Sequence, residues 1–429
     1  MTMSPTSHGS RTDPGALDER LQAAGLPRLG SLAWIEVDLD ALEANARVVR
    51  RLLPTGTALG IVVKANGYGH GLEMSARAAV AGGADWLIVA TLDEAQNVRR
   101  TGIELPLLAT YPLPSASLDE AADLDLDVTV GDGASVEAAI RAGAGRVASG
   151  GSSLRVQLEV DTGMTRGGVP AAEAVAVAGR LAAAPGIELR GVWSHLASGE
   201  DAAASRAQVG RYEAILAGLA AAGIVFPLRH MAASESLFRR TCPTYDLVRI
   251  GDAFYGGDDT TRAVAGPPLA EAAGDLRPAL ALKARAARIV EVAPGTAVGY
   301  GGTWEAQRPS IITTLTLGYA DGWPRSASPG ARVLVHGRRV PLVGRVSMDA
   351  IGVDVTDAAP VDHADEFVLV GAQGGERISA AEAATTRGTI ARELLAALGP
   401  RLPRVYLRGT RPVATATLPG ALIVAGSGD

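Results

Sequence analysis

The sequence predicts two domains: a closed (β/α)8 barrel of the TIM-like type, followed by a β-rich domain. Three observations support this. The chain has 429 residues, which is longer than a single domain with one hydrophobic core usually is. From about residue 33 to residue 255, short apolar runs alternate with alanine-rich stretches whose apolar residues recur at helical spacing. After residue 276, strand-like runs follow one another with Gly/Pro turns and little helix.

The alternating region predicts a parallel barrel. Strands that alternate with helices imply a parallel sheet, and about eight such units in this length favour a closed barrel over an open sheet. The expected strands are residues 34–39, 59–65, 86–91, 107–110, 127–130, 155–161, 189–196, 228–232 and 247–255. The expected helices include residues 74–81, 92–100, 136–141, 171–184 and 207–222.

The remaining segments complete the predicted domain organisation. In the second domain we expect strands at residues 281–292, 311–317, 332–335, 341–346, 351–355 and 367–370, and a helix at 389–398. Residues 257–275 are the expected linker, and a short helix is expected around residues 16–24. We therefore assign a flexible tail to residues 1–31, the barrel to 32–272, the β-rich domain to 273–418 and a second tail to 419–429.

Composition excludes several classes of protein. Hydrophobic residues make up 47% and charged residues 20% of the chain, as in ordinary globular proteins. The formal net charge is −6 without a Lys/Arg block, so no nucleic-acid partner is expected. The single cysteine, Cys242, excludes an intramolecular disulfide and a Cys-based zinc site. No apolar stretch is long enough to span a bilayer, and no signal-peptide pattern is present. We expect a cytoplasmic protein with no membrane partner.

The most informative stretch is residues 61–71, Ile-Val-Val-Lys-Ala-Asn-Gly-Tyr-Gly-His-Gly. Lys64 ends an apolar strand, where poor hydration lowers the pKa of its ammonium group and lets the amine attack a carbonyl. The glycines are expected to leave room for a bulky group that Tyr68 can reach. This pattern is typical of a lysine that holds a carbonyl cofactor covalently. The alternative is a strand-end lysine whose ammonium reaches solvent.

Polar residues also stand at the ends of other predicted barrel strands, where active sites of such barrels form. Each has a structural alternative when taken singly: a core histidine, a surface arginine, or a serine that caps a helix. Phosphate sites tend to form after strands seven and eight, where a hydroxyl and backbone N–H groups can hold the anion. The residues are Asp161 with Arg166, His195, Ser234, and Arg249 with Gly251.

Two other chemistries are not supported. Residues 143–148 match a loose dinucleotide fingerprint, but they follow a helical stretch where the fingerprint requires a strand. His8, His336 and His363 show no metal-ligand spacing with each other or with carboxylates, so we assign no catalytic metal.

Taken in order from about residue 32 to residue 418, these motifs resemble the alanine racemases, which depend on pyridoxal 5'-phosphate (PLP). The matching motifs are VVKANGYGHG at 62–71, VDTGM at 160–164 with Arg166, SH at 194–195, HMA at 230–232 with Ser234, VR at 248–249 with Gly251, YG at 255–256, VGYG at 298–301, GYADGW at 318–323, and VGRV at 343–346 with Met348 and Asp349.

The resemblance implies a PLP-dependent interconversion of L- and D-alanine by two bases, for D-alanine biosynthesis and peptidoglycan precursors. Lys64 serves one face of the substrate, and Tyr300 of the partner subunit in a homodimer serves the other. A tyrosine needs cationic or hydrogen-bonding neighbours to act as a base near pH 7, and His195 and Arg249 are the candidates. Arg249 would meet the pyridine nitrogen. The other implied cofactor contacts are Tyr68, Arg166, Ser234, Gly251, Asp252 and Arg392, the substrate contacts Arg166, Tyr319, Met348 and Asp349, and the supporting residues Glu159 and Asp161.

Several positions depart from the family pattern. Glu159 stands where the family commonly has a lysine, and we hypothesise that it pairs with Arg166. Asp252 places a carboxylate beside the phosphate, which is unfavourable without compensation. We therefore predict that Arg392 contacts Asp252 or the phosphate. The remaining departures are Ala233, for a usual asparagine, and Ile250, for a usual proline.

These departures leave the substrate open. One alternative is a racemase of another small amino acid such as serine. Another is a different PLP reaction on the same fold, such as decarboxylation, but those relatives use a cysteine acid and Cys242 lies outside the matched motifs. A third is a non-catalytic PLP-binding protein of the single-barrel type, which the second domain and Tyr300 disfavour.

Overall fold

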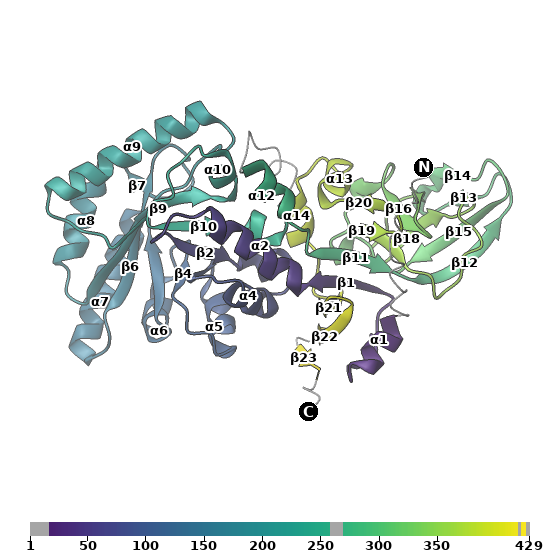
Figure 1. The fold of residues 1–429 in the computed structure, drawn as a ribbon, viewed down its shortest axis with the longest axis horizontal. Coiled ribbons are helices and arrows are strands. Elements are labelled where there is room, and N and C mark those ends of the chain that lie inside the picture. The colour runs from purple at the N-terminus through teal and green to yellow at the C-terminus, as the bar shows by residue number, and fades with distance from the viewer. Residues whose placement is uncertain (1–16, 258–268, 419–421, 426–429) are drawn as a thin grey trace, which may run out of the picture.

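The computed structural model describes residues 17–257, 269–418 and 422–425, and its first domain is a closed parallel barrel (Figure 1). Each barrel strand pairs with the strands on both sides, and the ring closes because β5 pairs with β6 and β2 pairs with β10. The barrel predicted from the sequence is confirmed. Its strands are β2 (Ala58–Val62), β3 (Trp86–Val89), β4 (Leu107–Ala109), β5 (Leu126–Val130), β6 (Leu154–Asp161), β8 (Ile187–Trp193), β9 (Leu228–Ala233) and β10 (Leu247–Ile250).

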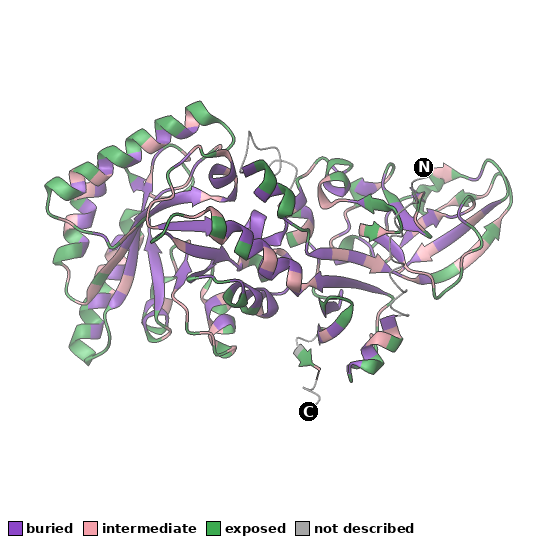
Figure 2. Ribbon diagram, in the orientation of Figure 1, coloured by how far each residue is buried: buried purple, intermediate pink, exposed green. Residues whose placement is uncertain are grey.

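Helices cover the outside of the barrel and bury its strands on both faces, which is why the strands read as continuous apolar runs. Figure 2 shows buried strands inside and exposed outer helix faces. Side-chain caps fix several helix starts: Asp132 forms a capping box with Ser135, and Asp201 accepts two backbone N–H groups. The main helices are α2 (Leu39–Leu52), α4 (Leu72–Ala81), α5 (Leu92–Arg100), α6 (Leu118–Asp123), α7 (Gly133–Ser149), α8 (Ala174–Ala183) and α9 (Ala202–Ala221).

The first predicted barrel strand is not part of the barrel. Residues 33–38 form β1 (Ala33–Asp38), which pairs antiparallel with β11 (Leu280–Ala284) and parallel with β21 (Arg404–Arg408). The prediction of a strand is confirmed, but its placement is wrong. An apolar run followed by an amphipathic helix looks the same in sequence whether or not the strand joins the next sheet, because periodicity reports the element and not its partner.

The second domain is β-rich, as predicted. Its main sheet runs in the order β12-β15-β18-β17-β16-β19-β11-β1-β21-β22-β23, with β20 on β19, while β13 and β14 form a separate ribbon. The remaining strands are β12 (Ala286–Val292), β13 (Ala297–Val298), β14 (Trp304–Glu305), β15 (Ser310–Leu315), β16 (Arg332–Val335), β17 (Arg338–Val343), β18 (Ile351–Asp354), β19 (Phe367–Gln373), β20 (Glu376–Ile378), β22 (Arg411–Ala416) and β23 (Leu422–Val424). The helix expected at 389–398 is α14 (Ala391–Ala396), and α13 (Ala380–Thr385) precedes it.

The predicted linker and tails contain regular structure. The linker segment ends in helix α12 (Leu269–Asp275), while residues 258–268 lie outside the described residues. The short N-terminal helix is confirmed as α1 (Leu17–Ala23), whose Leu17 and Leu21 are buried against a cluster that includes Trp34. Strand β23 pairs with β22, so the predicted C-terminal tail is partly ordered. Residues 1–16, 419–421 and 426–429 lie outside the described part of the chain.

Candidate active site

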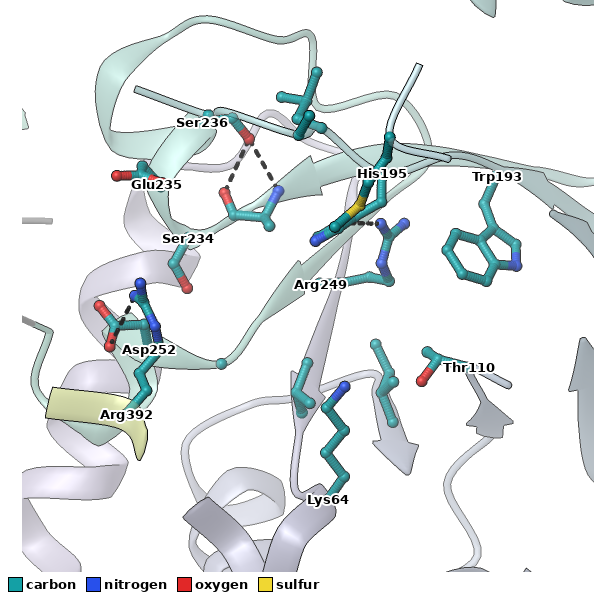
Figure 3. A pocket seen from close by; sticks show the side chains of 18 of the residues that line it. Lys64, Thr110, Trp193, His195, Ser234, Glu235, Ser236, Arg249, Asp252 and Arg392 are labelled. Carbon is teal, nitrogen blue, oxygen red and sulfur yellow. Dashed lines mark hydrogen bonds and ion pairs between the residues drawn. The ribbon is translucent and has the colours of Figure 1, made fainter. Parts of the chain in front are cut away.

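One cavity of about 300 Å³ lies at the C-terminal ends of the barrel strands (Figure 3). All nine residues that the sequence assigned to cofactor binding line it, although they come from distant parts of the chain. Parallel strands bring their carboxyl ends and the segments that follow them to one mouth, which explains the convergence of all but one of these residues. The exception, Arg392, reaches the cavity from helix α14 (Ala391–Ala396) of the second domain. The nine residues are Lys64, Tyr68, Arg166, His195, Ser234, Arg249, Gly251, Asp252 and Arg392.

Lys64 enters the cavity from an unusual turn. Strand β2 ends at Val62, and Lys64 opens the short turn α3 (Lys64–Tyr68), in which Ala65, Asn66 and Tyr68 have φ values of 53°, 53° and 51°. A run of non-glycine residues in the left-handed region is costly and is held only by its surroundings. Here the Ala65 N–H donates to Glu94 at 2.7 Å. Burial, followed by the nearby Arg166 charge, lowers the pKa of Lys64, in the direction expected from the sequence.

The glycines around this turn have a different role from the one expected. We expected them to leave room for a bound group, but Gly69 and Gly71 leave room for the second domain. A Cβ on Gly69 would overlap the Leu395 carbonyl of α14, and a Cβ on Gly71 would overlap the Tyr406 hydroxyl of β21. Both glycines have positive φ, at 85° and 99°. The turn that carries Lys64 therefore packs closely against the second domain.

Arg249 is the centre of a buried hydrogen-bond network. Its guanidinium donates to His230 Nδ1 at 2.6 Å, to His195 Nδ1 at 3.1 Å and to the Ser194 carbonyl at 2.8 Å. It also lies 4.8 Å from the centroid of the Trp193 ring. Burial lowers the pKa of Arg249 to about 10, so it stays protonated at neutral pH.

This network fixes the state of His195. Arginine can only donate, so the Nδ1 that faces Arg249 accepts, and the ring proton of neutral His195 lies on Nε2. Burial, together with the charges of Arg249 and Arg166, lowers the pKa of His195 to about 3. Of the two roles that the sequence left open for His195, a cation or a hydrogen-bond donor, the low pKa leaves that of a neutral donor. It lines the cavity and is not a core histidine.

The same logic extends into the barrel interior. His230 Nδ1 accepts from Arg249, so its Nε2–H donates to Gln157 Oε1 at 2.7 Å, and the Gln157 amide donates to Asp127 Oδ2 at 2.7 Å. All three side chains are buried. The roles of these residues were not predicted from the sequence. The available signal was a polar side chain inside a buried strand, which requires a partner.

The opposite side of the cavity has the geometry of an anion cradle. Ser234 Oγ accepts from the Ala253 N–H at 3.2 Å and so does not act as the cap of its own helix, α10 (Ser234–Arg239). A Cβ at Gly251 would lie 2.7 Å from Tyr68 Oη, so only glycine leaves this space open. Figure 3 shows Arg392 beside Asp252, and the two form an ion pair at 3.5 Å, which confirms that prediction.

Glu159 behaves differently from our hypothesis. No ion pair joins Glu159 to Arg166 within the described residues, so the proposed pair is not formed. The Arg166 guanidinium instead lies 5.7 Å from the Tyr111 ring centroid. Glu159 is only 6% exposed, and burial raises its pKa to about 7, although the charges of Arg166 and Arg249 oppose this. The loop around Arg166 is held by Asp161, whose carboxylate accepts the N–H groups of residues 163–165.

The remaining predicted residues lie outside the cavity. Tyr300 is 67% exposed on the short helix η3 (Tyr300–Gly302), next to β13 at the end of the second domain that is far from the barrel (Figure 1). Tyr319 and Met348 are also exposed, and a backbone hydrogen bond from Tyr319 to Ser347 joins their loops. Asp349 forms an ion pair with Arg401 at 2.8 Å. A single chain therefore does not bring Tyr300 to Lys64.

Other chemistries find no support in the described residues. Within them, no group of three or more His, Cys, Asp or Glu side chains is arranged to hold a metal ion. The residues of the loose dinucleotide fingerprint lie inside α7, away from any strand-to-helix turn. Cys242 is buried and does not line the cavity. In the described part of the chain, no helix has the length and apolar character needed to cross a membrane.

A barrel mouth that presents a lysine, a buried arginine and an anion cradle, joined to a β-rich domain, defines the barrel class of amino-acid racemases. The chain belongs to the alanine racemase family. The sequence model of the alanine racemase N-terminal domain matches residues 37–259, and that of the C-terminal domain matches residues 279–406. The family is PLP-dependent.

Individual relatives agree over nearly their whole length. The chain is 41% identical over 375 residues to an alanine racemase from Symbiobacterium thermophilum, covering 87% of this chain and 96% of the relative. It is 36% identical to one from Thermobifida fusca, with coverage of 89% and 100%. Among solved structures, alanine racemase from Bacillus anthracis with bound L-Ala-P is 33% identical with a TM-score of 0.82, covering 91% of this chain and 99% of that chain.

Proposed function

We propose that this protein interconverts L- and D-alanine with PLP bound at Lys64, and that Tyr300 of the partner subunit completes each site. It would act in the cytoplasm, where D-alanine is made for peptidoglycan precursors. The separation of the two bases supports this proposal most directly. Lys64 lies inside the cavity, whereas Tyr300 is exposed on the second domain, far from the barrel. Racemisation needs a base on each face of the α-carbon, so a second copy must supply one of them.

The residues present fit PLP. The space above Gly251, open only because it lacks a Cβ, is bordered by the hydroxyls of Tyr68 and Ser234, which can hold a phosphate. Arg392 offsets the Asp252 carboxylate at this end of the cavity. At the other end, Arg249 can only donate to the pyridine nitrogen, so that nitrogen stays neutral. Bound PLP supplies an electron sink that makes the α-proton of an amino acid acidic enough to remove.

The chain's own residues then supply the proton transfers. Lys64 has a lowered pKa, which increases the fraction of neutral amine able to take a proton at physiological pH. Arg166, exposed at the cavity wall, is placed to bind the substrate carboxylate. Arg249 contacts His195 at Nδ1, so the Nε2–H group of His195 is available to donate to another residue. We propose that it donates a hydrogen bond to the Tyr300 hydroxyl of the partner subunit. Tyr319, Met348 and Asp349 would line the entrance from that subunit.

The substrate is tested by α-proton exchange in D2O across a panel of amino acids, with chiral analysis of each product. Exchange with loss of optical purity, fastest for alanine, is the expected result. Faster racemisation of serine would keep the mechanism and change the substrate. A PLP-loaded protein that catalyses no exchange would refute the racemase assignment.

The composite site is tested by mixing two inactive variants, Lys64→Ala and Tyr300→Phe. In a mixed dimer, one site combines the intact Lys64 of one chain with the intact Tyr300 of the other, and the second site lacks both. Random exchange of subunits should restore about a quarter of wild-type activity per site. Variants that form dimers but recover no activity on mixing would show that each site is built from one chain. A Tyr245→Phe variant, which alters a tyrosine outside the cavity, is the matched control for Tyr300→Phe.

A further inference from the structure

A second cavity, of about 250 Å³, lies in the β-rich domain and shares no lining residue with the cofactor cavity. It is enclosed by the segment around Trp323, by strands β16 and β17, and by the end of α13. Its charged lining residues are Arg332, Arg339, Arg387 and Glu382. Arginines therefore outnumber carboxylates in a small, partly enclosed space.

Arg387 is the unusual member of this group. Arg387 is only 9% exposed, and its Nε, Nη1 and Nη2 atoms are all buried without a hydrogen-bond acceptor. The buried Trp323 Nε1 also has no acceptor. Buried donors without partners cost free energy, and a buried unpaired charge costs more. A missing water or ion is one explanation for a group of this kind, and here four nitrogen atoms on two neighbouring side chains lack an acceptor.

The stacking of these two side chains sets the direction of the donors. The Arg387 guanidinium carbon lies 3.5 Å from the centroid of the Trp323 ring. Contact of the guanidinium face with the indole face leaves the N–H bonds to point outward in the guanidinium plane. This planar fork matches the oxygen atoms of a carboxylate, sulfate or phosphate.

The nearby carboxylates are already used by another arginine. Arg339 pairs with Glu376 at 2.7 Å and also with Glu382. Arg332 and Arg387 form no ion pair within the described residues. Burial lowers the pKa of Arg387 to about 10, yet the group is still protonated at neutral pH. The cavity therefore carries excess positive charge.

We propose that this cavity binds a small inorganic oxyanion, such as sulfate or phosphate, between Arg387 and Trp323 Nε1, with Arg332 contributing long-range charge. The anion would supply the acceptors that the chain itself lacks. It would also brace the Trp323 segment, which follows directly on the helical turn η4 (Tyr319–Asp321).

The test uses the PLP-loaded protein, in which the cofactor fills the other anion site. Melting temperatures are measured at increasing millimolar sulfate, with ionic strength held constant by a bulky sulfonate buffer salt. Wild type and the control Arg206→Gln, which removes an exposed arginine on α9, should show the same saturable rise. Arg387→Met should lose the saturable rise, with sulfate affinity reduced by about tenfold or more.

Trp323→Phe is a second test variant for the sulfate titration, because it keeps the aromatic face but removes the Nε1–H donor. It should weaken sulfate binding while retaining saturation, and it keeps the test valid if Arg387→Met does not fold. Crystals soaked in bromide should also show an anomalous peak next to the Arg387 guanidinium. Equal sulfate responses in all variants, or an Arg387 paired with a carboxylate of a second copy in the crystal, would overturn the proposal.

Discussion

Replacing Glu159 with glutamine should change how stability depends on pH. Glu159 is 6% exposed, and burial raises its pKa from 4.5 to about 7. Each factor of ten in proton affinity is worth about 1.4 kcal/mol, so ionising this carboxylate in the native state costs at most roughly 3 kcal/mol. Because the native state binds the proton more tightly than the unfolded chain, the contribution is fully present below pH 4.5. It is lost as the pH rises through 7.

The assay is urea unfolding of the PLP-loaded protein between pH 5 and pH 8. Glutamine cannot ionise, so Glu159→Gln should match wild type at the acid end and become the more stable protein towards pH 8, by up to roughly 3 kcal/mol. Glu104→Gln, at an exposed loop glutamate, is the matched control and should follow wild type throughout. Parallel curves for wild type and Glu159→Gln would show that Glu159 ionises without cost, and the reasoning would fail.

Three further predictions concern the cofactor cradle and a helix. Gly251→Ala should weaken PLP binding by about tenfold or more, because the new Cβ would lie 2.7 Å from Tyr68 Oη and overpacking costs about 1–3 kcal/mol; absorbance titration with PLP measures this. Gly145→Ala, whose Cβ would meet nothing within 4 Å inside α7, should raise stability by about 0.5–1 kcal/mol in thermal melts and leave PLP affinity unchanged. Arg392→Ala should weaken PLP binding by removing positive charge from beside Asp252, and a double Arg392→Ala, Asp252→Ala variant should recover much of the loss. If the double variant binds PLP no better than the single one, the two side chains do not act as a pair.

The parts of the site that the sequence predicted share one physical property. Lys64, Ser234 and Gly251 each lie within two residues of the end of a barrel strand. The carboxyl ends of parallel strands meet at one mouth of the barrel, independently of the conformation of the loops. Strand order along the chain was therefore enough to predict that these residues meet. Pairing of Arg392 with Asp252 was also predictable, since a carboxylate in an anion cradle requires a compensating cation.

Other features depended on three-dimensional detail that the sequence does not contain. Neutral His195 follows from which of its nitrogen atoms faces Arg249, and the two residues lie 54 positions apart in the chain. Glu159 and Arg166 form no ion pair, because the loop that carries Arg166 is held by hydrogen bonds from its backbone N–H groups to the Asp161 carboxylate. Gly69 was misinterpreted because its close neighbour, Leu395, comes from the other domain.

The position of β1 also has a consequence for biosynthesis. This strand leaves the ribosome before any of the barrel, yet its two neighbours in the sheet begin at Leu280 and Arg404. Its backbone N–H and C=O groups cannot be satisfied in the native way until nearly the whole polypeptide has been synthesised. The barrel can close earlier, because its strands all lie between residues 58 and 250. During translation β1 is therefore an apolar strand without its native neighbours, and chaperones or other unfolded chains can bind it.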